Sequence, residues 1–294
     1  MSTPAPTSDP AALPVTIHAH SWLHRFRLHI RVFFSFIARA VVSHLEFRVD
    51  FLAEVIASLC AHGAGLITLW VMFNNVHDLH QDASQLLYSK WQVLFIYGVS
   101  FLSMALFSVF SFNIYRFADK YIVKGEYDRV LVRPLNPIFQ ILIEAIDMTS
   151  VPDLFLGFGV IWYSADGVGF HFTIRNLVLL GGFAVGGAMT LIGIFTALSA
   201  LAFWFEAEIG ILPPVYNLAQ FGRWPLKIYN KFFQVVLTWI LPVAFIGFFP
   251  AAFFMQAGEY SNYALLTPLV GLACMALGVG VFKLGTHHYT GAGG

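Results

Sequence analysis

Residues 124–137 read KGEYDRVLVRPLNP and form a short charged insert between long apolar segments of the chain. Each of its two prolines pushes the preceding residue out of the α-helical region, so any helix through Tyr127–Val132 must end there. The charged side chains of the insert cannot lie in hydrocarbon, so we expect it in water between two membrane spans. A rigid, charged helix at the membrane surface is suited to pressing on a soluble partner.

The composition is that of an integral membrane protein. Of 294 residues, 58% are hydrophobic and 11% are charged, and the mean hydropathy is +0.73. Soluble domains carry about 25% charged residues. Alternating ten-residue segments of the outer-membrane barrel type are absent, so we expect an all-α bundle of membrane-spanning helices. The formal net charge is zero, which by itself says nothing about nucleic acid. We expect no nucleic-acid partner for this membrane protein.

The first fifty residues precede the apolar spans. Residues 1–20 are rich in Pro, Ala, Ser and Thr, which predicts a disordered tail rather than a signal peptide. Residues 21–50 place large apolar residues at helical spacing, with Arg27 and Arg31 on another face. This pattern predicts an amphipathic helix that lies in the headgroup region of the membrane.

Residues 51–284 contain six apolar segments, each long enough to cross a membrane with about 20 residues. We expect spans at residues 51–73, 91–113, 138–163, 176–204, 232–254 and 263–282, with a charged loop at 116–137 and a polar tail at 285–294. Pro242 and Pro250 are expected to bend the fifth span. Gly182 and Gly186 stand four residues apart in the fourth span, a spacing that permits close helix packing. We expect them at a helix interface, either between subunits or within the chain.

Four carboxylates fall within the expected spans: Glu54 in the first, and Glu144, Asp147 and Asp153 in the third. Charged groups at that depth must face protein or water. We expect Glu54 to pair with an arginine of a neighbouring segment, with a substrate pathway as the alternative. The acidic third span leaves two other classes open. One is an ion-coupled secondary transporter, and the other is a membrane-embedded lipid-modifying enzyme that uses these carboxylates as metal ligands or bases.

The distribution of Lys and Arg predicts the topology. With six spans, 14 of the 16 basic residues lie on one side, and only Lys90 and Arg175 lie on the other. Without the third span the split is 11 against 5. Cytoplasmic loops carry the excess of Lys and Arg, so six spans with both termini in the cytoplasm are favoured. Arg223, in the connection 205–231, is then expected in the cytoplasm.

The chain carries no motif for catalysis or nucleotide binding. There is no GxxxxGK[ST] phosphate loop, no HExxH, no GxSxG and no CxxC pair. We therefore expect no catalytic residue, no metal and no cofactor in this chain. If ATP is used, it must bind to another polypeptide.

The insert resembles the cytoplasmic loop of type-2 ABC transporter permeases, the ABC-2 membrane family, in its compact six-span branch. The pattern Gly-acidic-x-Asp…Arg-Pro-x-x-Pro is supplied by Gly125, Glu126, Asp128, Arg133, Pro134 and Pro137. The segment LPVAFIGFFPAAF is similar to the Pro…Pro-Ala segment of the family's fifth span, with Pro242, Pro250 and Ala251 in the matching positions. The resemblance covers about residues 25–290.

This resemblance implies a half-transporter of the bacterial plasma membrane. Two permeases, identical or paralogous, would lie among membrane lipids on two cytoplasmic ABC ATPase subunits that bind ATP and Mg²⁺. Closure of the ATPases would push a coupling helix at Glu126–Val132 and move substrate outward. The implied ATPase-coupling residues are Gly125, Glu126, Tyr127, Asp128, Arg129, Arg133, Pro134 and Pro137.

Overall fold

The computed structural model describes residues 22–79, 88–207, 209–256, 258 and 260–291, which form helices and connections without a strand. The expected tail at residues 1–20 lies outside the described residues. The elements are α1 (Trp22–Glu46), α2 (Arg48–Leu79), α3 (Lys90–Tyr115), η2 (Phe117–Val123), α4 (Tyr127–Leu131), α5 (Pro137–Glu144), η3 (Met148–Ser150), α6 (Val151–Val168), α7 (Ile174–Ser199), α8 (Ala202–Phe205), α9 (Leu212–Ala219), η4 (Gln220–Arg223), η5 (Leu226–Ile228), α10 (Lys231–Val235), η6 (Val236–Ile240), η7 (Val243–Phe245), α11 (Phe248–Phe254), α12 (Tyr260–Ala264) and α13 (Thr267–Thr286).

Four helical segments among the described residues are long and apolar enough to cross a membrane: Arg48–Asn74, Lys90–Ser111, Ile174–Phe205 and Thr267–Thr286. A fifth crossing results if Lys231–Ile240 and Val243–Phe254, which meet at 75°, form one broken span. Helices satisfy their own backbone hydrogen bonds in lipid. The architecture is therefore that of an all-α, multi-pass membrane protein.

The expected third span is not one continuous helix, because α5 and α6 are separated by η3. The Asp147 carboxylate accepts hydrogen bonds from the backbone N–H of Thr149 at 2.9 Å and from the hydroxyl of Ser150 at 2.7 Å. Pro152 follows in the first turn of α6. A proline breaks a helix interior but is tolerated in a first turn. These residues therefore begin a new helix where the apolar pattern alone predicts an uninterrupted one.

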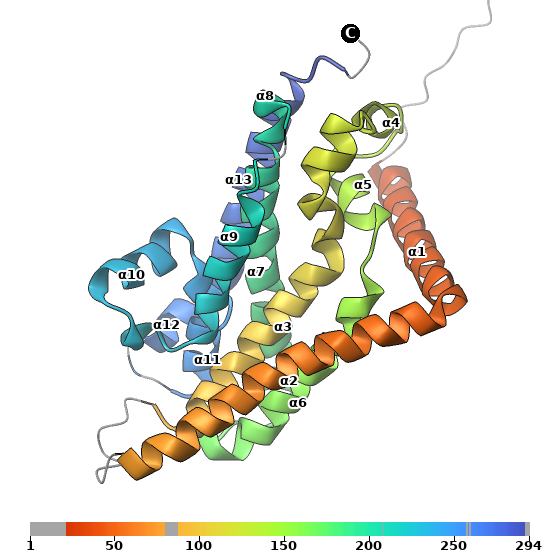
Figure 1. Ribbon diagram of the computed structural model, residues 1–294. Coiled ribbons are helices and arrows are strands. Elements are labelled where there is room, and N and C mark those ends of the chain that lie inside the picture. Colours follow the sequence, from red (N-terminus) through yellow and green to blue (C-terminus); the bar gives the residue numbers. More distant parts are fainter. Residues whose placement is uncertain (1–21, 80–87, 208, 257, 259, 292–294) are drawn as a thin grey trace, which may run out of the picture.

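Helix α3 lies at the centre of the bundle and packs against α6 and α7 (Figure 1). Its side chains Phe95 and Phe107 are completely buried. Helix α6 lies very close to α3 at Gly98, where a Cβ would come within 2.8 Å of Ile161 Cγ1. Glycine thus allows the backbones of α3 and α6 to approach, as small residues do in membrane bundles.

Helices α7 and α13 pack through glycines that repeat every seven residues. A Cβ on Gly271 would overlap the carbonyl oxygen of Gly186, and a Cβ on Gly278 would overlap that of Gly193. Seven residues are about two helical turns, so both pairs lie on one face. Gly182, expected beside Gly186, is instead exposed, and a Cβ there would meet no atom within 4 Å. The position of α13 determines which face of α7 is covered. The spacing of glycines along α7 alone does not predict that face.

The bend in the expected fifth span lies at Pro242, between η6 and η7. The interrupted backbone finds a partner on α3, because the Ser103 hydroxyl donates a hydrogen bond to the Ile246 carbonyl at 2.8 Å. Broken helices are tolerated within membrane proteins where such groups are satisfied. Pro250 lies in the first turn of α11. Its missing N–H removes no helical hydrogen bond there.

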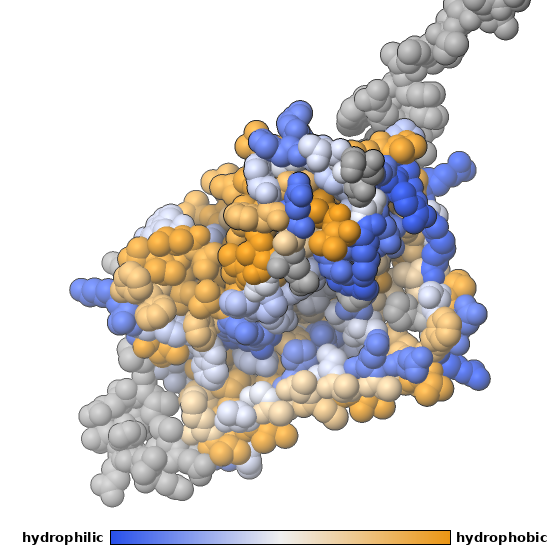
Figure 2. Space-filling model, turned by 45° about the horizontal axis from the view of Figure 1, so that its top comes forward, coloured by the Kyte–Doolittle hydropathy of each residue, from blue (hydrophilic) through white to orange (hydrophobic). Residues whose placement is uncertain are grey.

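Helices α1 and α2 lie on the outside of the bundle, and the chain turns sharply between them (Figure 1). The expected amphipathic segment 21–50 contains α1 and the first residues of α2. Seen with the α4 end of the molecule brought forward, hydrophilic residues gather around that end and along its outer side, next to broad hydrophobic areas (Figure 2). Exposed apolar side chains such as Val132 also lie at that end, beside the hydrophilic ones.

Candidate functional site: the α4 end of the bundle

The charged insert lies at one end of the bundle, between η2 and α5 (Figure 1). Gly125 has a φ of +70°, a left-handed conformation that suits glycine, and it turns the chain from η2 into α4. Asn136 is extended, and its side-chain oxygen accepts hydrogen bonds from the backbone N–H of Ile138 at 3.0 Å and of Phe139 at 3.3 Å. With Pro137 in the first turn, this N-cap begins α5.

One face of α4 is fixed in the bundle by Tyr127, which is completely buried. Its ring packs edge-on against four aromatic rings with centroids 5.0–6.2 Å away: Phe117, Phe203, Phe282 and Tyr289. The hydroxyls of Tyr127 and Thr286 lie 3.1 Å apart and share a hydrogen bond. Burial raises the pKa of Tyr127 above its ordinary value, and the hydrogen bond to Thr286 offsets only part of this increase. Sequence reasoning missed Thr286, since nothing in its local pattern links it to α4.

The opposite face of α4 is open. We use the name outer face of α4 for the exposed residues Asp128, Arg129 and Leu131 of the helix together with Val132 and Arg133, which directly follow it. Val132 is 85% exposed and Leu131 is 46% exposed. Apolar side chains within a charged, exposed segment are typical of a surface that a protein partner covers. Their position between charged side chains is the sequence signal that could identify these two residues.

The eight residues expected to act in coupling have different positions. Gly125, Pro134 and Pro137 shape the backbone around α4 and α5. Tyr127 faces inward, and the charged Asp128, Arg129 and Arg133 belong to the outer face. Glu126, partly exposed, directly precedes α4. The structure thus separates the residues that hold α4 in place from those that a partner could reach.

A polar cluster connects η2 with α5 beside α4. The Tyr121 hydroxyl donates a hydrogen bond to Glu144 Oε2 at 3.0 Å, and Lys120 Nζ lies 3.7 Å from Glu144 Oε1. Lys120 also donates to Asn113 Oδ1 at 3.4 Å, and Asn113 Nδ2 donates to the Ile141 carbonyl at 2.9 Å. Burial raises the pKa of Tyr121, and the nearby Glu144 carboxylate raises it further. The Glu144 carboxylate is therefore satisfied within the chain.

Asp153 forms a second polar cluster, between α6 and α2. It is 7% exposed, and its two carboxylate oxygens accept the Ser58 hydroxyl at 3.0 and 3.3 Å. His62 Nε2 lies 3.5 Å from Asp153 Oδ2. Glu54 is exposed on α2, and the ion pairs formed between described residues do not include it. The expected pairing of Glu54 with an arginine is not found there.

The three carboxylates of the expected third span do not form a common site. Glu144 contacts η2, Asp147 caps η3, and Asp153 contacts α2. Within the described part of the chain, no group of three or more His, Cys, Asp or Glu residues could hold a metal ion. This arrangement does not support an enzyme that uses these three side chains as metal ligands.

Arg223, which the charge distribution places in the cytoplasm, is instead buried against the middle of α3. It is 9% exposed, and its Nε–H donates to Met104 Sδ at 3.3 Å. Its guanidinium carbon lies 5.4 Å from the ring centres of both Tyr97 and Phe101. A guanidinium is weakly hydrated and stacks on aromatic rings, which allows this burial. The segment before α10 therefore follows α3 into the bundle.

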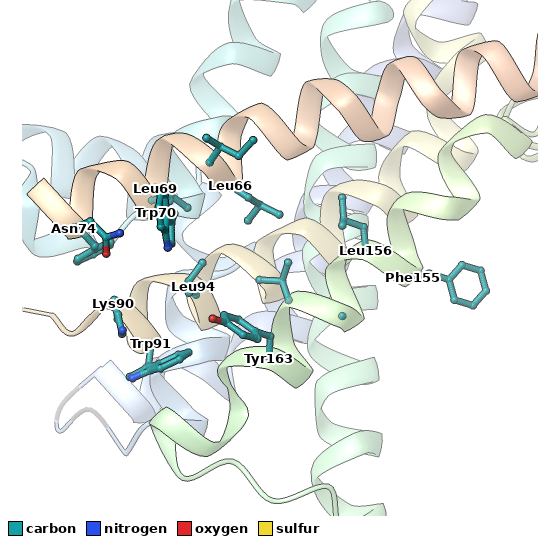
Figure 3. A pocket seen from close by; sticks show the side chains of 14 residues that line it. Leu66, Leu69, Trp70, Asn74, Lys90, Trp91, Leu94, Phe155, Leu156 and Tyr163 are labelled. Carbon is teal, nitrogen blue, oxygen red and sulfur yellow. The ribbon is translucent and has the colours of Figure 1, made fainter.

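Two apolar cavities lie along α2 where it passes α6. The first, of about 490 Å³, lies between α2, α3 and α6, with Lys90 and Trp91 at one end (Figure 3). The second, of about 730 Å³, lies further along α2 and is lined by Arg48. Phe155 and Leu156 of α6 line both cavities.

The family model described as ABC-2 family transporter protein matches residues 59–293, which include every described element from α3 to α13. No curated protein and no solved structure matches the chain. The matching model covers most of the chain and includes α4, its inward contacts and the bend at Pro242. Members of this family are the membrane components of transporters and associate with ABC ATPases. The chain belongs to the ABC-2 family of transporter proteins.

Proposed function

We propose that this chain is the permease subunit of an ATP-driven exporter in the bacterial plasma membrane, where it pairs with a second permease and with two ABC ATPases. The observation that carries this proposal is the division of α4 into a buried face and an exposed face. The buried face, Tyr127 and Val130, belongs to the permease core. The outer face of α4 is available to the ATPase, which supplies ATP and Mg²⁺.

Tyr127 is the residue through which a push on α4 would reach the bundle. Its ring touches Phe117 of η2, Phe203 of α8 and Phe282 of α13. Movement of α4 therefore displaces the ends of three other elements. The ATPase must bind the outer face of α4 differently in its two nucleotide states, because only differential binding shifts a conformational equilibrium.

We further propose that the α4 end faces the cytoplasm and that the chain crosses the membrane six times. The concentration of Lys and Arg in α1 and around α4 supports this orientation. In this topology α5 and α6 together make the third crossing, and the broken segment from α10 to α11 makes the fifth. Both termini then lie in the cytoplasm.

The coupling proposal is tested by reversing charges beside and on α4. An ATPase surface that binds the native carboxylates would carry positive charge. The double variant Glu126→Lys with Asp128→Lys would place two more positive charges against that surface. We expect normal membrane insertion and at least a tenfold loss of ABC ATPase co-purifying with the tagged permease. Glu206→Lys is the control. Glu206 is exposed and directly follows α8, which lies at the same end of the bundle as α4 (Figure 1), but it does not belong to the outer face of α4.

Glu126 and Asp128 also interact favourably with the helix dipole at the start of α4. Each such interaction contributes only about 0.3–1 kcal/mol to the stability of the fold. Loss of folding is therefore not expected in the double variant, and the thermal transition of the purified permease checks this. Full ATPase binding by the double variant would refute the coupling role of α4.

A further inference from the structure

We infer that the cavity between α2, α3 and α6 binds one anionic phospholipid of the surrounding bilayer, with an acyl chain in the cavity and the phosphate at Lys90. This inference does not depend on the proposed coupling through α4. It assigns a ligand to the flank of the bundle along α2, away from the outer face of α4.

The cavity has the size and lining of a site for an acyl chain. Its walls include Leu66 and Trp70 of α2, Leu94 of α3, and Leu156 of α6. Figure 3 shows these residues around one elongated space, with Lys90 and Trp91 at one end and Phe155 toward the other. Its volume of about 490 Å³ falls in the range of small-molecule pockets, about 300–1,000 Å³.

The cavity exists because α2 stands away from a tightly packed α3–α6 pair. A Cβ on Gly167 would overlap Trp91, so these two helices are in close contact beside the cavity. Helix α2 contributes little to the core, and only 6% of its membrane-spanning window is buried. Its polar link to α6 is the cluster of Ser58, His62 and Asp153. An apolar space open to the bilayer does not retain water, so hydrocarbon is the chemically matched occupant.

One end of the cavity is suited to a phosphate. Lys90 is exposed, and its Nζ lies 4.7 Å from the centre of the Trp91 ring. The ring centres of Trp91 and Tyr163 lie 5.4 Å apart. Trp and Tyr are typical of the headgroup level of a membrane. Among the described residues, no acidic side chain lines the cavity or forms an ion pair with Lys90. Within the described part of the chain, no carboxylate therefore competes with an anionic headgroup for the Lys90 ammonium.

Gly159 provides a direct test, because it lines the cavity and a Cβ there would meet no atom within 4 Å. Gly159→Leu should place its side chain in the space proposed for the acyl chain, because its Cβ meets no protein atom there. Gly181→Leu is the matched control, since Gly181 is a helical glycine on α7 that also has open space at its Cβ. Lys90→Gln removes the positive charge at this position, and Lys90→Arg keeps it.

The measurement is native mass spectrometry of the purified full chain, titrated with phosphatidylglycerol or with phosphatidylcholine of the same acyl chains. The wild type should bind one phosphatidylglycerol more tightly than phosphatidylcholine. Lys90→Gln should weaken phosphatidylglycerol binding about fivefold, which corresponds to about 1 kcal/mol for one basic residue near a membrane surface. Lys90→Arg should retain the preference, and Gly159→Leu should lose the tight site for both lipids.

Thermal unfolding of each variant shows whether it is folded, and Gly159→Ala offers a smaller step if the leucine variant is not. That step should reduce binding only partly. A Lys90→Gln variant that keeps the headgroup preference would overturn the assignment of the phosphate to Lys90. An unchanged tight site in folded Gly159→Leu would overturn the cavity as the binding place.

Discussion

The hydroxyls of Tyr127 and Thr286 lie 3.1 Å apart, although the two residues are 159 positions apart in the chain. This hydrogen bond joins α4 to the last residue of α13. Tyr289, which follows α13, covers the same ring with its centroid 5.0 Å away. The C-terminal segment is therefore part of the support of α4, and the proposed signal from an ATPase would reach α13 without passing through the intervening helices.

Removing the Tyr127 side chain in two steps should separate the hydrogen bond from the ring packing. Tyr127→Phe loses one hydrogen bond and should cost about 0.5–1.5 kcal/mol. Tyr127→Ala also loses the contacts with four rings and should cost about 3–5 kcal/mol. Thermal unfolding of the purified permease measures both. Val132→Ala is the control, because Val132 is 85% exposed, and its stability should match the wild type.

The glycine contacts between α7 and α13 predict a position-specific effect on the same helix. Gly278→Ala places a methyl group against the Gly193 carbonyl and should destabilise the protein by about 1–3 kcal/mol, as overpacking does. Gly280→Ala meets no atom within 4 Å and should be neutral or slightly stabilising, because alanine favours helices. Equal thermal stabilities of the two variants would contradict this packing.

The cluster around Asp153 predicts energetic coupling between α2 and α6. Asp153→Ala leaves the Ser58 hydroxyl without its partner and should destabilise the protein by about 1–3 kcal/mol. Asp153→Asn keeps an acceptor for Ser58 and should have a smaller effect. In a double-mutant cycle, Ser58→Ala should add little once Asp153 is alanine. Strictly additive effects on unfolding would show that the two side chains do not interact.

The raised pKa of Tyr121 predicts sensitivity to alkaline pH at the α4 end. Tyrosine normally titrates near pH 10, and burial together with the Glu144 charge favours the neutral phenol in the folded state. The unfolded chain therefore loses this proton first. The stability that Tyr121 contributes is complete below about pH 10 and falls as the pH rises above it. The thermal unfolding temperature of Tyr121→Phe should fall less steeply above that pH than that of the wild type. Near pH 7 the two proteins should show the same dependence on pH.

The charged insert at residues 124–137 shows how far local sequence can predict this protein. Arg133-Pro134 and Asn136-Pro137 predict that a helix through Tyr127–Val132 must end there, and α4 ends at Leu131, just before them. The chain contributes this information locally, because proline restricts its own backbone and that of its neighbour. The face of α4 that is buried was not predictable, since five residues define no amphipathic pattern.

The membrane class, the helical composition and the absence of enzyme motifs follow from the sequence by itself, because hydrophobicity and charge content decide whether a chain can lie in lipid. Only the tertiary structure decided which groups meet. It placed Gly186 but not Gly182 against α13, divided the expected third span at Asp147, and buried Arg223 against α3. Such contacts join residues far apart in the chain, and they depend on how whole helices cross, which periodicity within one helix does not specify.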